Sequence, residues 1–189
     1  MNIQAIGLLR PDPKIPEWLV SEPVSVPYFD GQRLTFTLDG LDTADEEDAK
    51  SAIAAFLALG AQERAAAAPY LYTNYRHVAS LVDKADLACE IASVPSVWEH
   101  VQPSEIFVSR RHRHDRAIYV QIMAECAWEP EHGLQVVYRR GCQLPRVSEQ
   151  DGHLTHTDAC DLPESEDKIV EAPAASLKES TRKSWWKLW

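Results

Sequence analysis

The sequence predicts an α+β fold: an N-terminal β-hairpin, a helical insert and a C-terminal antiparallel β-meander. Apolar and polar residues alternate over 33–38 and again over much of 118–147, which is the period of a β-strand. Between these two regions, residues 43–82 carry apolar residues at helical spacing. Because the strands fall in two runs around a helical segment, the pattern favours α+β over a parallel α/β sheet.

The first predicted element is a hairpin within residues 18–41, preceded by an arm or short edge strand over residues 1–16. Asp30 and Gly31 form a turn signal between two strand-like runs. The second run places three apolar residues on one face: Leu34, Phe36 and Leu38. The sequence therefore predicts a half-buried second strand.

The helical insert is predicted to contain two to four helices. Thr43 is expected to be the N-cap of the first, with Glu46 completing a capping box, and Gly60 is expected to follow its end. Pro69 is expected to open a further helix, because proline suits the first helical turn. A short helix is predicted over 83–92.

After a predicted loop to Pro103, the meander begins with a strand at 105–109. Three more strands are predicted over 118–128, 134–138 and 142–147. Proline and glycine between the first two of these three favour a tight reversal there. The expected result is an antiparallel sheet of about four strands.

The charge of the chain limits its partners. Acidic residues outnumber basic residues by 29 to 19, and the formal net charge is −10. This balance argues against nucleic acid as a partner and is compatible with a cationic protein partner. One basic run, Arg110–Arg116, is predicted to be a solvated hairpin tip, since no aromatic residues interleave it to stack on bases.

The cysteines and the N-terminus indicate the compartment. Four cysteines lie far apart without a CxxC pair, as expected for small buried hydrophobic residues: Cys89, Cys126, Cys142 and Cys160. The N-terminus lacks the pattern of a signal peptide, and no stretch has the roughly 20 apolar residues of a spanning helix. A cytoplasmic protein is therefore expected.

The composition changes near residue 160. We predict a single domain over residues 1–160 and a flexible tail over residues 161–189. The tail ends in a tryptophan-rich segment that contains Trp185, Trp186 and Trp189. Indole rings suit both protein pockets and membrane interfaces, so three targets stay open: the tail's own domain, a protein partner, or peripheral contact with a membrane.

A polar cluster surrounds the turn of the meander and the residues after its last strand. It comprises Glu125, Glu129, Glu131, His132, Asp151, His153, His156, Asp158 and Cys160. These residue types bind zinc or transfer protons, and residues 151–156 would converge on 129–133 if the last strand brings them back. Each also has a structural alternative, such as an Asx-turn of Asp151 over Gly152.

Catalytic signatures are missing from the sequence. There is no HExxH, no GxSxG, no phosphate-binding glycine loop and no dinucleotide-binding GxGxxG motif. We therefore assign no catalytic residue and expect no cofactor. Metal binding by His132 and His153 is kept as the alternative, and Trp128 is expected to anchor the core at a strand end.

The stretch ECAWEPEHGLQVVYRRG, followed by RVSEQDGHLT, resembles a bacterial family of unknown function. Members of that family carry a W-E-x-E-H-G-L turn between two strands and a later D-G-H-L motif. The resemblance extends upstream through PYFDG, AFLAL and PYLYTNY and covers most of residues 16–158. It implies a shared fold and no assigned activity. The positions that match the two motifs are Trp128, Glu129, Glu131, His132, Gly133, Asp151, Gly152 and His153.

The functional expectation combines this resemblance with the acidic charge. Related small acidic bacterial domains are suspected of being immunity or accessory proteins beside contact-dependent toxins, which is an association at the level of fold. We expect a non-enzymatic module that binds a protein partner such as a toxin. Its expected binding residues are Trp128, Glu129, Glu131, His132, Asp151 and His153. The alternative is an enzyme that binds a metal or small ligand through Glu131, His132, Asp151 and His153.

Overall fold

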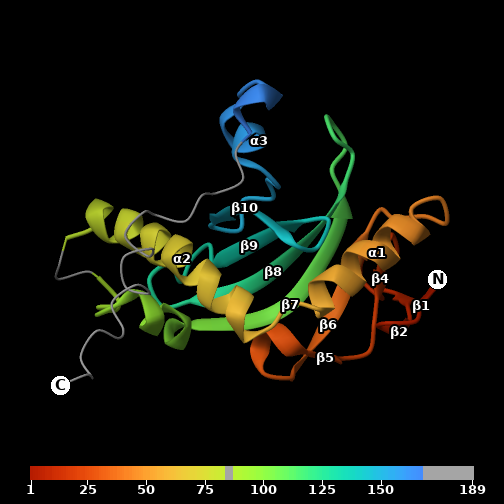
Figure 1. Cartoon of the computed structure of the whole chain (residues 1–189), viewed down its shortest axis with the longest axis horizontal. Helices are drawn as coiled ribbons and strands as arrows, with labels where there is room; N and C mark the ends of the chain where they lie inside the picture. Colours follow the sequence, from red (N-terminus) through yellow and green to blue (C-terminus); the bar gives the residue numbers. More distant parts are fainter. Residues whose placement is uncertain (84–86, 168–189) are drawn as a thin grey trace, which may run out of the picture.

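The computed structural model describes residues 1–83 and 87–167. Its main feature is an eight-stranded sheet with the strand order β10-β9-β8-β7-β6-β4-β3, in which β5 also pairs with β6. Helices α1 (Glu46–Leu57) and α2 (Ala61–Leu81) lie against one face of this sheet (Figure 1). The strands of the sheet are β3 (Arg10–Pro11), β4 (Trp18–Val20), β5 (Val24–Val26), β6 (Gln32–Asp39), β7 (Val101–Arg110), β8 (Ile118–Cys126), β9 (Leu134–Arg139) and β10 (Gln143–Ser148).

The predicted α+β class is confirmed, together with both of its β regions. Strands β5 and β6 form the N-terminal hairpin around a short 3₁₀ helix, η1 (Pro27–Phe29), and Asp30 takes a left-handed conformation in the turn. Strands β7 to β10 pair antiparallel in sequence order. The N-terminal arm forms a small antiparallel pair, β1 (Asn2–Ile3) and β2 (Gly7–Leu8).

The two β regions belong to one sheet, which the sequence did not indicate. Strand β6 pairs in parallel with β7, in a register that runs from Thr35 opposite Glu105 to Asp39 opposite Ser109. A parallel pair needs a long crossover connection, and α1 and α2 supply it. The helical insert is therefore the link between two strands that lie side by side.

The hydrophobic core lies between the helices and the sheet. Leu34, Phe36 and Leu38 of β6 are buried there, as their alternation predicted. The hydroxyl groups of Tyr28 and Tyr138 lie 2.9 Å apart inside this core. Burial raises the pKa of Tyr138 to about 12, so the pair stays neutral and hydrogen-bonded at physiological pH.

The first helix does not begin with the predicted capping box. Helix α1 begins at Glu46, and Thr43 lies in the preceding turn. That turn is closed by the Asp42 carboxylate, which accepts the Ala44 N–H at 2.7 Å. The carboxylate of Asp45, next to the helix, pairs with Arg110 at 2.7 Å and does not cap the helix. Ion pairing and a local turn therefore replace the cap.

A capping interaction is found instead at the start of α2. The Glu63 carboxylate accepts the Gly60 N–H at 2.8 Å, so Gly60 precedes the second helix. Pro69 lies inside α2 and does not open a new helix. Alanine is the best helix former, and the run Ala65–Ala68 carries the helix up to the proline. The Trp98 indole N–H donates to the Arg64 carbonyl at 2.9 Å, which anchors this part of the helix.

The connection from α2 to the sheet also differs from the prediction. In the described part of 83–92, residues 87–92 form no helix, and Ile91 is held by its N–H donating to the Tyr75 hydroxyl at 3.1 Å. The predicted loop before Pro103 contains a 3₁₀ helix, η2 (Val94–His100), and the first residues of β7.

The chain after β10 packs against the other face of the sheet. It forms α3 (His156–Cys160) and a 3₁₀ turn, η3 (Glu164–Glu166). Leu154 joins a small second core on that face, together with Ala117, Tyr119 and Val137. Residues 161–167, which the sequence assigns to the tail, are thus part of the described structure. The boundary at residue 160 stays a prediction, and residues 168–189, with Trp185, Trp186 and Trp189, lie outside the described residues.

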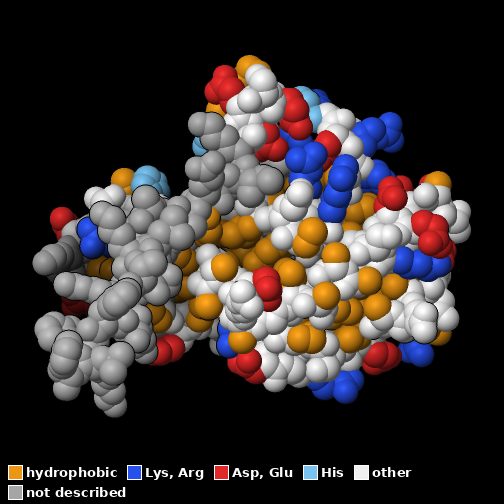
Figure 2. Space-filling view, viewed as in Figure 1, with side chains coloured by type: hydrophobic (Ala, Val, Ile, Leu, Met, Phe, Trp, Pro, Cys, Tyr) orange, Lys and Arg blue, Asp and Glu red, His pale blue; other side chains and the backbone are white. Residues whose placement is uncertain are grey.

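Arg111 fastens this C-terminal segment to the β7–β8 hairpin. The sequence predicted a solvated turn, but the Arg111 side chain is only 3% exposed. Its guanidinium donates to Asp158 at 2.8 and 2.9 Å and to Glu164 at 2.9 Å. Basic and acidic side chains gather where the hairpin meets the C-terminal segment (Figure 2). A buried charge is stable only when it is paired in this way.

We predict that Arg111→Gln lowers the free energy of unfolding by about 3 kcal/mol at pH 7, because it leaves two half-buried carboxylates without their cation. Burial alone would raise the pKa of Asp158, but the hydrogen bonds from Arg111 outweigh it and lower that pKa. A lowered pKa stabilises the fold at neutral pH, and this contribution is lost as the pH falls through the folded-state pKa. Urea denaturation should therefore show a smaller difference between the two proteins at acidic pH.

The control is Arg113→Gln, which alters an exposed arginine of the same turn and should change stability by less than about 0.5 kcal/mol. A loss that is equal for the two variants, or one that does not shrink on acidification, would contradict this role of Arg111.

A second prediction concerns Gly141, where the turn between β9 and β10 touches α1. Gly141 has φ +75°, and a Cβ there would lie 1.9 Å from the Ala52 carbonyl oxygen. Gly141→Ala should lower the free energy of unfolding by about 3 kcal/mol, from backbone strain plus the clash. Gly40→Ala is the matched control, because Gly40 also has a positive φ but has open space around it. It should lower the free energy of unfolding by about 1 kcal/mol, the cost of a Cβ in a left-handed backbone conformation. If chemical denaturation shows the same loss of unfolding free energy for both variants, the contact of Gly141 with Ala52 of α1 does not restrict this position.

Candidate functional site

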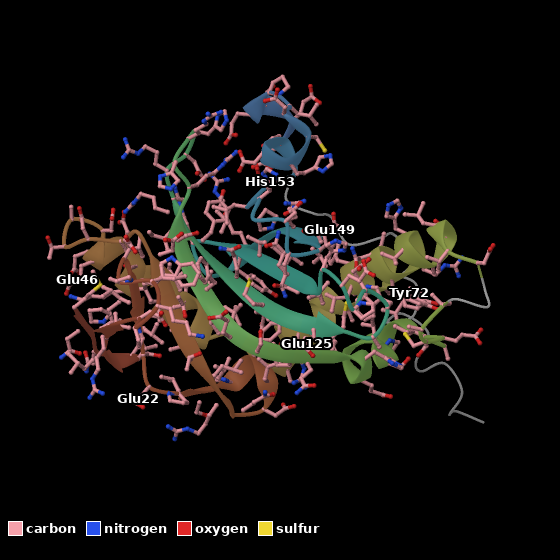
Figure 3. The ribbon with its side chains drawn as sticks, turned by 180° about the vertical axis from the view of Figure 1, so that it is seen from behind. Glu22, Glu46, Tyr72, Glu125, Glu149 and His153 are labelled. Carbon is pink, nitrogen blue, oxygen red and sulfur yellow. The ribbon has the colours of Figure 1, made fainter. Side chains whose placement is uncertain are left out.

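On the face of the sheet opposite α1 and α2, which we call the open face, the described residues form a groove of about 680 Å³ beside α3. Figure 3 looks onto this face, with His153 near its upper edge. One wall is the hairpin segment 110–114 and the other is formed by parts of 150–162. The floor consists of side chains from five neighbouring strands: Trp18, Asp39, Glu105, Phe107, Ser109, Gln121, Met123 and Gln135.

Strand alternation explains why these side chains share one face. In β7, Ile106 and Val108 are buried against the helices, so Glu105, Phe107 and Ser109 point to the groove. The register then aligns side chains from different strands. Glu105 lies opposite Met123 of β8, and Met123 lies opposite Gln135 of β9. On the other side, Asp39 of β6 lies between Trp18 of β4 and Ser109 of β7.

Hydrogen bonds hold the polar side chains of the floor in place. The Thr37 hydroxyl donates to the Glu105 carboxylate at 2.9 Å, and the Gln121 amide donates to the Ser109 hydroxyl at 3.3 Å. Such bonds fix the rotamers of the floor before any ligand binds, which lowers the entropic cost of binding.

Gln135 is the most deeply buried polar residue of the floor. Its side chain is 0% exposed, and its amide nitrogen lies 3.0 Å from three acceptors: the Ser148 hydroxyl, the Asp151 carboxylate and the His153 carbonyl. Its oxygen, Oε1, has no hydrogen-bond partner among the described residues. An unpaired buried acceptor costs free energy, and because Gln135 is 0% exposed, a ligand could not reach this atom unless the side chain moved.

The predicted Asx-turn at Asp151 is confirmed. The Asp151 carboxylate accepts the His153 N–H at 3.0 Å and also pairs with Arg146. Burial alone would raise the pKa of Asp151, but the hydrogen bonds from Arg146 and His153 lower it. Asp151 is therefore an ionised structural residue at neutral pH, and it orders the segment that forms one wall of the groove.

The other predicted site residues cluster at the turn after β8, outside the groove lining. Trp128 is 3% exposed, and its indole N–H donates to Asn74 at 2.9 Å, so it anchors the core. Glu129 and His132 bind each other at 3.0 Å, with His132 exposed to solvent. Glu131 is exposed at the same turn. Of the predicted binding residues, only His153 contributes to the groove.

The two segments are joined just before residue 151: the Gln150 N–H donates to the His132 carbonyl at 3.3 Å, and the Gln150 side-chain amide donates to the Ala124 carbonyl at 2.9 Å. The expected convergence of residues 151–156 on 129–133 stays a prediction. Within residues 1–83 and 87–167 no three His, Cys, Asp or Glu side chains are grouped so that they could hold a metal ion. In the described part of the chain, His132 and His153 therefore belong to no group of three such ligands.

Sequence reasoning did not identify the floor of the groove. Its residues are ordinary polar and aromatic positions of alternating strands, and only the parallel β6–β7 register brings the N-terminal ones beside the rest. The available signal was a glutamate, a phenylalanine and a serine on one face of a single strand, at 105, 107 and 109. This alternation shows that the three side chains share one face of the strand, but it does not show that they form a binding site.

Comparisons with known proteins place the chain in a family. Among the described helices, none has both the length and the apolar character that a membrane crossing requires. No curated protein and no solved structure matches the chain. A family model described as a domain of unknown function (DUF6985) matches residues 5–154, which include every strand of the large sheet and both long helices. The expected membership of a family of unknown function is thereby confirmed, and the chain belongs to the DUF6985 family.

Proposed function

We propose that the protein is a non-enzymatic binding module that takes a segment of another protein into the groove on the open face of the sheet. The observation that carries this proposal is the groove itself, in which aromatic and hydrogen-bonding side chains are combined on a rigid floor. Binding sites commonly combine apolar surface with a few fixed polar groups in this way. Elements of the sheet supply the floor, so its geometry does not depend on the loops.

The hydrogen-bonding capacity of the floor supports a peptide-like ligand. Glu105 and Ser109 line the groove and are only partly buried, so they can form hydrogen bonds with a ligand. A peptide backbone offers both N–H donors and carbonyl acceptors, so it can satisfy such groups along its length.

The kind of partner follows from the charge and from the resemblance of the sequence. A net charge of −10 favours encounter with a cationic protein. An immunity-type protein that binds a cognate toxin is the specific form that we propose on this basis. The alternative, an enzyme that uses Glu131, His132, Asp151 and His153, has less support, because Glu131 and His132 lie outside the groove and Asp151 is committed to Arg146.

The test is affinity capture from the cells that produce the protein, with the wild type and Phe107→Ala. Phe107 lies in the floor and removing its ring takes away apolar contact area, so we expect the captured partner to bind the variant at least about tenfold more weakly. Calorimetry with the purified partner would measure the change, and circular dichroism would confirm that both proteins are folded.

The matched control is Leu81→Ala, which removes a large apolar side chain that is 71% exposed at the end of α2, away from the groove. It should bind the partner as the wild type does. Equal binding by the wild type and Phe107→Ala, or recovery of no stoichiometric partner under several growth conditions, would overturn the proposed function.

A further inference from the structure

One end of the groove combines two aromatic rings with two carboxylates. Trp18 of β4 and Phe107 of β7 are in edge-to-face contact, with ring centroids 5.1 Å apart and an interplanar angle of 79°. Asp39 lies directly opposite Trp18 on the neighbouring strand, and Glu105 lies two residues from Phe107 on the same face. We call these four residues, Trp18, Asp39, Glu105 and Phe107, the acidic–aromatic end.

The two carboxylates of this end have no cation. In residues 1–83 and 87–167, neither Asp39 nor Glu105 forms an ion pair; Glu105 accepts a hydrogen bond only from the neutral Thr37 hydroxyl. Three arginines line the same groove, and two of them are engaged elsewhere. Arg110 pairs with Asp45 and Asp48, and Arg111 pairs with Asp158 and Glu164. The third, Arg113, is exposed on the hairpin wall, and within the described residues no ion pair links it to Asp39 or Glu105. The negative charge of the acidic–aromatic end is therefore not neutralised by an ion pair.

The surroundings of the two carboxylates strengthen their effect on a ligand. Asp39 and Glu105 are both partly buried, so their charges are less screened than those of fully exposed side chains. Aromatic faces also attract cations, and arginine in particular stacks on them. Asp39 lies opposite Ser109, four residues along β7 from Glu105, so a guanidinium or ammonium group beside the rings can pair with one carboxylate or the other.

The dimensions of the groove favour a chain over a free cation. Its floor extends from β4 to β9, and four strand spacings amount to about 19 Å. One arginine side chain would fill only the acidic–aromatic end. An extended segment can also cover the rest of the floor, from Gln121 to Gln135, which one side chain would leave empty.

We infer that the acidic–aromatic end recognises an arginine or lysine side chain, presented by an extended segment of the protein partner that lies along the groove. This inference rests on the proposed function and names the chemistry of the segment that is bound. The acidic–aromatic end would then be the place where the negative charge of the chain contacts the cationic partner directly.

The test uses synthetic peptides with the full-length protein. The probe is an acetylated and amidated Val-Thr-Val-Arg-Val-Thr-Val, compared with the same peptide carrying lysine or the neutral arginine analogue citrulline. The Trp18 indole N–H signal, assigned with Trp18→Phe, reports binding by nuclear magnetic resonance. We expect both cationic peptides to shift this signal and to bind about tenfold more tightly than the citrulline peptide.

The variant for this test is Asp39→Asn/Glu105→Gln, which removes both charges and keeps the shape of the side chains. It should bind all three peptides with equal, weak affinity. The control, Glu90→Gln/Glu99→Gln, changes the net charge equally at two exposed positions outside the groove and should retain the preference for cationic peptides. Equal binding of the arginine and citrulline peptides by the wild type would overturn the inference.

Two further arms separate the possible failures. Arginine amide and spermidine test for a free cation, and binding of either one as tightly as the arginine peptide would overturn recognition of a protein segment. With the captured partner, loss of binding in Phe107→Ala together with unchanged binding in Asp39→Asn/Glu105→Gln would overturn this inference and leave the proposed function standing. Unchanged binding in both variants would overturn the two together.

Discussion

The parallel pairing of β6 with β7 is the constraint on which the rest of the structure depends. Without it, the N-terminal hairpin and the C-terminal meander would be two small sheets, each with an exposed edge. With it, one twisted sheet supports a continuous core on one side and a continuous groove on the other. The same pairing brings Asp39 beside Ser109, so the two halves of the chain contribute to one floor.

The two faces of the sheet differ in the kinds of side chain that they carry. The face under α1 and α2 is apolar, and its few polar atoms, such as the paired hydroxyls of Tyr28 and Tyr138, satisfy one another. The open face is rich in amides, hydroxyls and charges. Most of these are paired within the fold, and Arg111 is the strongest case. Among the described residues, the carboxylates of Asp39 and Glu105 have no cationic partner, so they stand out as places where a second molecule can interact.

The elements that were predictable from the sequence are those set by local pattern. The alternation of Leu34, Phe36 and Leu38 identified β6, because the period of a strand is readable from one segment. The capping boxes were harder to predict, because Thr43 and Gly60 each stand three residues before a glutamate. In the structure, the residue next to the first helix, Asp45, pairs with Arg110, and this ion pair replaces the capping box expected at Thr43. The site depends on which strands are neighbours. The turn at Glu129 and His132 was a candidate site because of its residue types, but in the structure these two side chains pair with each other.

The position of β6 also has a consequence for synthesis on the ribosome. Its hairpin partner β5 precedes it, so that edge can pair as soon as both strands have left the exit tunnel. The other edge must wait for β7, which is translated more than 60 residues later. At about 5–20 residues per second, this interval lasts several seconds. During this interval, the nascent chain exposes the unpaired edge of β6 together with its apolar side chains Leu34, Phe36 and Leu38. Such a surface is the kind that chaperones bind.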